Sequence, residues 1–202
     1  MGKKIAFMLC VLFVSISLSA FSPLITHAGE PTDQVKNTVD EVIKILNNKE
    51  LKKPENRAER QKKIRETIEK SFDFEEMAKR SLALHWKKRT PQEQKEFTSL
   101  FSDLLEDTYI RKIERYEDEK VIYTAEKTEG SYATVRTRIV TTKGTEIPVD
   151  YKIFKKDQKW EVYDIFVEGV SLVNNYRSQF NEIIRAGSYE ELVQKLKKKV
   201  LK

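Results

Sequence analysis

Apolar residues recur every three or four positions through the first half of the chain, which is the spacing of one face of an α-helix. This pattern predicts helices over 31–48, from a lysine-rich turn at 52–54 to about 70, over 74–89, and from 90 to about 113. The fourth helix begins with Thr90-Pro91-Gln92-Glu93, a capping box with proline in its first turn. Its apolar stripe is so wide that it needs cover on more than one side.

After Tyr116 the apolar positions alternate with polar ones, which is typical of strands with one buried face. The alternation predicts strands over 121–127, 132–142, 145–155 and 159–168, joined by the short turns of an antiparallel meander. Helical spacing then returns over 170–185, ended by Gly187, and from 188 to about 200. This order predicts an α+β fold, in which a four-stranded twisted antiparallel sheet packs against N-terminal and C-terminal helices.

The first 28 residues have the pattern of a secretory signal peptide. Lys3 and Lys4 precede an apolar run over 5–18, and Thr26 and Ala28 supply small residues for cleavage after Ala28. The apolar run is too short to span a bilayer, so it predicts export rather than a membrane anchor. The expected organisation is therefore a signal peptide over 1–28 and a single domain over 29–202.

Removing residues 1–28 changes the composition of the chain in two ways. It removes Cys10, so the mature chain has no thiol for a disulfide or for a thiolate metal site. It also removes Lys3 and Lys4, which lowers the formal net charge from +6 to +4. A modest basic excess in an exported protein favours anionic membrane surfaces or acidic partners over nucleic acid, although a charged fraction of 35% also keeps a chain in solution.

Residues suited to catalysis are few. His85 is the single histidine after residue 28, which excludes zinc and general-base schemes that need several histidines. Residues 169–173 resemble a nucleophile elbow, but Val173 stands in place of the second glycine. A triad of Ser171, His85 and Asp164 remains the enzymatic alternative, whereas helix capping is the simpler role for Ser171. The sequence favours a binding or carrier protein without catalytic residues, metal or cofactor.

Three stretches of the sequence are together similar to one family: FDFEEMAKRSLALHW, TPQEQKEFTSLFSDLLEDTY and KWEVYDIFVEGVSLVNNYRSQFNEII. In order and spacing they resemble the MlaC family of periplasmic phospholipid-binding proteins, also called the toluene-tolerance auxiliary family. The similarity covers nearly all of the chain after residue 28. It departs from the family at Ala83, where relatives often carry glycine before the tryptophan block.

The resemblance implies a periplasmic carrier with a phospholipid as cargo, held by its acyl chains in an apolar cavity between the twisted sheet and the helices. It also implies two partners, an inner-membrane ABC transporter with a substrate-binding ring and an outer-membrane lipoprotein–porin complex, and a role in outer-membrane lipid asymmetry. No nucleic acid is expected, and the protein is expected to be a monomer. A carrier of another lipid, such as a hopanoid, or a ligand-free adaptor module would fit the same pattern.

The apolar residues that exceed the needs of a thin sheet are the candidates for the wall of this cavity. For each one taken alone, ordinary core packing is the alternative. The phenols of Tyr151 and Tyr176 would suit a cavity mouth, because each joins an apolar ring to a polar tip. The candidates are Met77, Leu82, Trp86, Phe97, Phe101, Leu104, Tyr109, Val149, Tyr151, Ile153, Val170, Val173, Tyr176 and Phe180.

Overall fold

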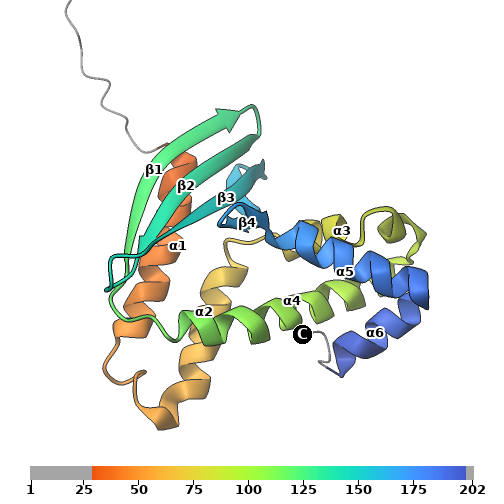
Figure 1. Ribbon diagram of the computed structural model, residues 1–202, viewed down its shortest axis with the longest axis horizontal. Helices are drawn as coiled ribbons and strands as arrows, with labels where there is room; N and C mark the ends of the chain where they lie inside the picture. The colour runs from red at the N-terminus through yellow and green to blue at the C-terminus, as the bar shows by residue number, and fades with distance from the viewer. Residues whose placement is uncertain (1–28, 199–202) are drawn as a thin grey trace, which may run out of the picture.

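The computed structural model describes residues 29–198, and the predicted signal peptide lies outside this range (Figure 1). The helices of the described chain are α1 (Glu30–Asn47), α2 (Arg57–Glu69), α3 (Phe74–Leu82), α4 (Pro91–Ile113), α5 (Leu172–Ala186) and α6 (Tyr189–Lys197). Short 3-10 helices cover Pro54–Asn56 and Ala83–Lys88. The strands are β1 (Lys120–Glu129), β2 (Tyr132–Val140), β3 (Glu146–Lys156), β4 (Lys159–Val167) and β5 (Val170–Ser171).

The predicted α+β fold is confirmed, with one difference in the sheet. The strands lie in the order β1-β2-β3-β4-β5, and every neighbouring pair is antiparallel. The fifth, two-residue strand arises because Glu168 and Gly169 both have positive φ, the backbone of a tight two-residue hairpin turn. That turn pairs Val170 with Val167, so the prediction that Val170 opens a helix is wrong. The helix begins at Leu172, after Ser171.

The predicted helix over 74–89 is interrupted in its middle. Helix α3 ends at Leu82, and the next residue, Ala83, has φ 49° and ψ −117°. A residue with a Cβ atom rarely adopts this backbone conformation, whereas glycine does so readily. The chain then continues to Lys88 as a 3-10 helix. Ala83 therefore occupies a position whose backbone geometry suits glycine better than alanine.

A filled group of helices makes up one half of the molecule, which we call the helical lobe. It consists of α3, α5, α6 and the first half of α4 (Figure 1). Phe97, Phe101 and Phe180 lie at its centre and are fully buried. The Phe101 and Phe180 rings meet edge to face at a centroid distance of 5.5 Å. The lobe is held together by close aromatic packing.

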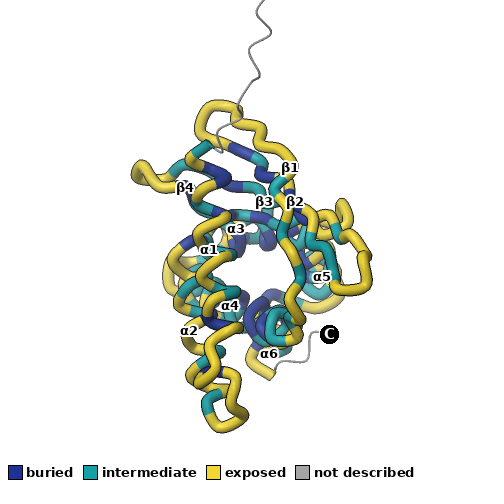
Figure 2. Tube along the Cα trace, turned by 90° about the vertical axis from the view of Figure 1, so that its left-hand side faces the viewer, coloured by how far each residue is buried: buried dark blue, intermediate teal, exposed yellow. Residues whose placement is uncertain are grey.

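The other half, which we call the sheet lobe, contains β1 to β4, α1, α2 and the second half of α4. Helix α1 lies along one face of the sheet, where Val35 packs with Val135 and Ile153 (Figure 1). Buried residues lie in β2, β3 and β4, while the connection between α1 and α2 is mostly exposed (Figure 2). Within residues 29–198, none of the helices is both long and apolar enough to cross a membrane.

Candidate functional site

A cavity of about 560 Å³ lies between the sheet, α1 and the second half of α4, and α3 and α5 of the helical lobe also contribute to its wall. This volume is within the range of pockets that hold organic ligands, and most of the wall residues are apolar. The wall residues from α1 and its neighbours are Val35, Val39, Val42, Ile43, Leu46, Ile68, Phe72 and Phe74. Those from the sheet are Val121, Ile139, Ile147, Val149, Tyr151, Val162, Ile165 and Val167, and those from the remaining helices include Met77, Leu105, Tyr109, Ile110, Ile113 and Leu172.

Strand alternation accounts for the sheet side of this wall. Ile147 pairs with Ile139, and Val149 and Tyr151 follow on the same face of β3 because side chains two apart point the same way. The remaining residues of that face, such as Ile153, are covered by α1. The sheet therefore presents one continuous apolar face, of which α1 covers one part and the cavity occupies another.

Helix α4 passes from the helical lobe into this wall. Phe97 and Phe101 in its first half are buried against α5 and α6, whereas Tyr109, Ile110 and Ile113 in its second half line the cavity. The wide apolar stripe read from the sequence thus has two different covers along its length. In the first half of α4 the stripe is covered by the packed core of the helical lobe, and in the second half it borders the cavity.

Of the fourteen sequence-predicted wall residues, four line this cavity: Met77, Tyr109, Val149 and Tyr151. Eight others belong to the packed interior of the helical lobe: Leu82, Trp86, Phe97, Phe101, Leu104, Val173, Tyr176 and Phe180. Ile153 lies beneath α1, and Val170 is 63% exposed outside the wall. Contact of these fourteen residues with a lipid stays a prediction, and the structure places the open volume beside only part of the set.

Sequence reasoning missed the contribution of α1. Val35, Val39 and Val42 fall on one helical face and line the cavity, but the same spacing is equally typical of a helix that simply covers a sheet. The strand residues Ile139 and Ile147 lie in two of the predicted strands, and their cross-strand pairing places both in the wall. What decides this role is the distance between α1 and the sheet, and the periodicity of a sequence carries no information about that distance.

Two tyrosines keep their phenols protonated at the cavity. Burial raises the pKa of Tyr151 to about 12. Burial also raises the pKa of Tyr109 to about 12, and a side-chain hydrogen bond with Tyr176 acts in the same direction. Tyr176 thus bonds to a wall residue while its own ring packs against Phe101. Both wall phenols are neutral near pH 7 and can offer hydroxyl groups without a charge.

A buried carboxylate lies in the mostly apolar wall. The side chain of Glu106 on α4 is 5% exposed, and its Oε2 lies 2.6 Å from Nη2 of Arg65 on α2. Burial raises the pKa of Glu106, and the guanidinium of Arg65 offsets this effect only in part. This pair joins α2 to α4 beside the cavity.

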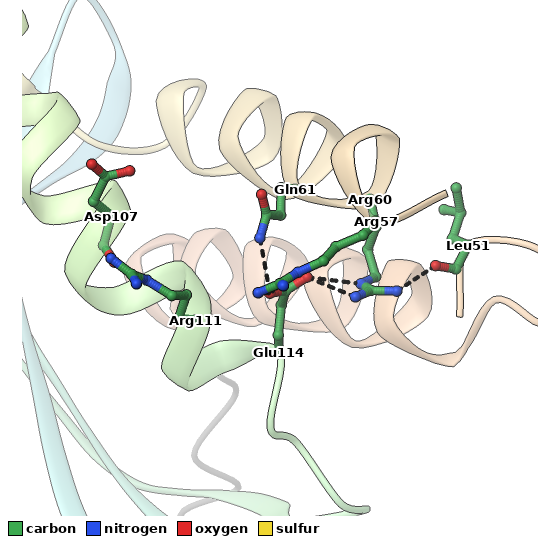
Figure 3. A network of polar contacts seen from close by, with 7 residues as sticks. All are labelled: Leu51, Arg57, Arg60, Gln61, Asp107, Arg111 and Glu114. Carbon is green, nitrogen blue, oxygen red and sulfur yellow. Dashed lines mark hydrogen bonds and ion pairs between the residues drawn. The ribbon is translucent and has the colours of Figure 1, made fainter. Parts of the chain in front are cut away.

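A second carboxylate, Glu114 just after α4, anchors α2 at the other end (Figure 3). Its Oε1 lies 2.7 Å from Nη2 of Arg60, and its Oε2 lies 3.1 Å from Nη2 of Arg57 and accepts a hydrogen bond from Gln61 at 2.9 Å. Burial opposes ionisation, but the hydrogen bonds from Gln61, Arg60 and Arg57 outweigh it, so the pKa of Glu114 is lowered. The charged helix α2 is held mainly by these ion pairs and by buried Ile64.

Of the three groups considered for a catalytic triad, Ser171 and Asp164 are hydrogen-bonded to each other, but His85 has another partner. Ser171 accepts a hydrogen bond from the Asn174 backbone N–H at 2.9 Å, which confirms its role as helix cap, and donates to Asp164 at 2.6 Å. The Nε2 of His85 pairs instead with Asn181, ten residues further along α5 and so about 15 Å away along the helix axis. No group of three His, Cys, Asp or Glu side chains suited to a metal ion occurs among residues 29–198.

An α+β fold with an apolar cavity between its sheet and helices defines a class of protein, the non-covalent binders of apolar ligands. Comparison with protein families narrows the class, because the model of the family described as "MlaC protein" matches residues 36–198. The chain therefore belongs to the MlaC family, which confirms the resemblance seen in the three sequence stretches.

Individual relatives support this assignment. The chain is 22% identical over 138 residues to the intermembrane phospholipid transport system binding protein MlaC of Haemophilus influenzae, a match that covers 66% of this chain and 64% of that protein. It thus spans just under two thirds of that relative's length. It is 24% identical over 173 residues to toluene tolerance protein ttg2D of Pseudomonas putida, covering 84% of this chain and 80% of the relative.

A solved structure has the same fold. It is the phospholipid-binding protein from Ralstonia solanacearum in complex with a phospholipid, with a TM-score of 0.73 and 25% sequence identity. The match covers 84% of this chain and 96% of that one. The described part of this chain thus has the architecture of a protein that was crystallised with a lipid.

Proposed function

We propose that this protein is a periplasmic phospholipid carrier, which receives lipid at one membrane and delivers it to the other. The single observation that carries the proposal is the apolar cavity of about 560 Å³ in a chain of the MlaC family. The lipid in the Ralstonia structure and the phospholipid transport named for the Haemophilus relative support the same cargo.

The physical demand on such a carrier is to shelter acyl chains from water. Each methylene group kept out of water contributes about 0.8 kcal/mol, so a long acyl chain needs an extensive apolar wall. A bilayer shelters the same chain equally well, and therefore transfer between membrane and carrier can be nearly neutral in free energy. The protein then needs neither catalysis nor a cofactor, and the direction of transfer depends on its partners.

The partners we propose are those implied by the family. They are an inner-membrane ABC transporter with a substrate-binding ring and an outer-membrane complex of a lipoprotein with a porin. Export through the signal peptide over 1–28 would bring the protein between them. A carrier of this kind would help to maintain the lipid asymmetry of the outer membrane.

Native mass spectrometry of the protein purified from a bacterial host tests the proposal. We expect adducts with the mass of phospholipids, identified by extraction and fragmentation. Adducts with the mass of a hopanoid or of another lipid would identify that lipid, rather than a phospholipid, as the cargo. Repeated detection of the bare chain alone, under gentle conditions, would rule out the carrier and favour the ligand-free adaptor.

A cavity-filling variant links the lipid to this cavity. Val149 lines the wall, so Val149→Trp should place its ring in the open volume and abolish lipid adducts with little loss of stability. Val170→Trp is the matched control, because Val170 is 63% exposed outside the wall. Equal lipid loading of the two variants would show that the lipid binds elsewhere.

A further inference from the structure

The charged residues of the cavity wall are concentrated at one end. Apart from Glu106, the charged wall residues are Lys112, Arg115 and Glu119, which lie within eight positions where α4 ends and the chain turns toward β1. Gln34, Thr38 and Ser71 elsewhere in the wall are polar but uncharged, and the Thr38 hydroxyl donates to that of Ser71 at 2.7 Å. The cavity is therefore amphipathic, with one charged rim.

The side chain of Lys112 is tied to the cavity itself. Its Nζ lies 4.9 Å from the centroid of the Tyr109 ring, and Tyr109 is a wall residue. Arg115 lies three positions further on, across the last turn, where its backbone N–H donates to the Lys112 carbonyl at 3.1 Å. Residues three apart on a helical turn share a face, so the ammonium and the guanidinium flank the same edge of the cavity.

The rim matches the charge of one phosphodiester. Among the wall residues of this rim, two cations and the carboxylate of Glu119 leave a net charge of +1, opposite in sign to the single negative charge of a phosphodiester. Glu117 and Asp118 are exposed in the same segment but lie outside the wall. The Glu119 Oε2 already accepts a hydrogen bond from the Glu117 N–H at 2.6 Å. Guanidinium and ammonium groups form the strongest hydrogen bonds to phosphate oxygens, whereas an acyl chain gains nothing from them.

We propose that Lys112 and Arg115 bind the phosphodiester of the lipid headgroup while the acyl chains fill the apolar part of the cavity. This inference rests on the proposed function, and it adds that the protein distinguishes a phospholipid from an uncharged diacyl lipid. It also sets the polarity of the bound lipid, with the headgroup at the end of α4 and the chains directed toward α1 and β3.

Basic residues in the last turn of a helix also compensate the helix dipole, and the same turn supplies a control for that role. Arg111 belongs to this turn but not to the cavity wall, and its Nε donates to the Asp107 backbone carbonyl at 2.9 Å (Figure 3). Lys95 is an exposed lysine near the other end of α4, also outside the wall. The pair Lys95→Gln/Arg111→Gln therefore removes the same charge as Lys112→Gln/Arg115→Gln, and its two positions lie on the same helix as Lys112.

The experiment offers delipidated protein two lipids with identical chains. Vesicles of dioleoylphosphatidylglycerol with a minor fraction of dioleoylglycerol are mixed with the wild type and both double variants, and native mass spectrometry measures the two adducts relative to the vesicle composition. We expect the wild type and the control pair to prefer the phospholipid about tenfold, which corresponds to about 1.4 kcal/mol. The rim pair should lose this preference and still bind dioleoylglycerol, which shows that it is folded.

Salt and free phosphate provide two further arms. Because the rim is exposed, added salt should reduce the preference of the wild type toward that of the rim pair. Inorganic phosphate at millimolar concentration should not bind saturably to the delipidated protein, because the acyl chains supply most of the affinity. Tight binding of inorganic phosphate at the rim would assign these cations to free phosphate and overturn the inference.

The two-lipid experiment has further outcomes that would contradict the inference or the proposed function. An undiminished preference in the rim pair, or an equal loss in the control pair, would contradict a role for Lys112 and Arg115 in headgroup binding. A wild type that binds neither lipid would instead overturn the proposed function. The two failures are therefore distinguishable.

Discussion

The two lobes are built from similar apolar side chains, yet one is filled and the other is hollow. In the helical lobe, Phe97, Phe101 and Phe180 lie with ring centroids 5.5 to 6.0 Å apart and no exposed surface. In the sheet lobe, valines and isoleucines of α1 and β3 surround a cavity of about 560 Å³. Helix α4 contributes to both, so a single helix runs from a close-packed interior into the wall of a cavity.

The comparison shows that hydrophobic residues do not by themselves make a filled core. Protein interiors are normally packed as densely as organic crystals, and a void lined by apolar atoms loses dispersion contacts. We therefore expect the helical lobe to contribute more to the stability of the fold than the sheet lobe does. In the sheet lobe, ion pairs attach α2 to the end of α4 and to Glu106. These ion pairs do not depend on close packing of side chains across the cavity.

The largest expected effect is the truncation of an aromatic ring in the filled lobe. Phe101→Ala should lower the free energy of unfolding by about 3–5 kcal/mol, because the ring is fully buried among aromatic neighbours. Ile147→Ala in the cavity wall should lower it by much less, since that side chain already borders open space. Urea denaturation measures both values. Equal losses would contradict the division into filled and hollow lobes.

The next effect concerns the ionic attachment of α2 to the hollow lobe. Glu114→Gln should destabilise the protein by about 2 kcal/mol at neutral pH, because hydrogen bonds to charged groups are lost at Arg57 and Arg60. Since the pKa of Glu114 is lowered in the folded state, its stabilisation is present above the usual pKa of glutamate and is lost as pH falls through the folded value.

Thermal denaturation of the Glu114→Gln variant across a pH series checks this sign. The gap between wild type and variant should be widest near pH 7 and should close in acid. The exposed ion pair of Glu66 with Lys62, at 3.9 Å, offers a control, because Glu66→Gln should have almost no effect at any pH. A gap that persists in acid would mean that packing, rather than charge, holds α2 in place.

A smaller, stabilising effect is expected in the helical lobe. Ala83→Gly should raise the free energy of unfolding by about 1 kcal/mol, because φ 49° with ψ −117° strains a residue that has a Cβ. Ala78→Gly in the interior of α3 should have the opposite sign. Chemical denaturation of both variants checks the prediction, and a destabilised Ala83→Gly variant would show that this backbone is not strained.

The smallest effect should be at the carboxylate in the cavity wall. Burial raises the pKa of Glu106, so the folded protein retains a proton that the unfolded chain releases, and this residue's contribution to stability falls as pH rises above about 4.5. Glu106→Gln removes this term and should leave stability near pH 7 within about 1 kcal/mol of wild type, because Arg65 remains partly hydrated. A large loss near pH 7 would instead make the Arg65 pair a principal support of the wall.

Most of the fold follows from patterns that local physics imposes. The capping box at Thr90, the alternation over the four long strands and the cap at Ser171 are each set by a few neighbouring residues. The errors lie where the backbone departs from its local preference. The helix ends just before Ala83, although alanine is a residue that favours helices. The positive φ of Glu168 allows a tight turn, after which Val170 pairs as a strand residue.

The cavity could be anticipated only in part. Tyr109, Val149 and Tyr151 face it because helical and strand periodicity set their direction. Phe101 and Phe180 have the same apolar character, but they lie where helices approach closely enough for their rings to meet. Whether a surplus of apolar residues fills space or borders it depends on the separation of α1 and α4 from the sheet, and that separation is a property of the whole fold.

The two edges of the sheet are protected in different ways. At the β4 edge, the segment over 71–73 pairs with Val162, where the Val162 N–H donates to the Ser71 carbonyl at 2.8 Å, and β5 covers the other end. At the β1 edge, an irregularity between Tyr123 and Ala125 breaks the regular ladder. Neither edge therefore offers a long, regular template for a strand of another chain, which disfavours aggregation by strand addition.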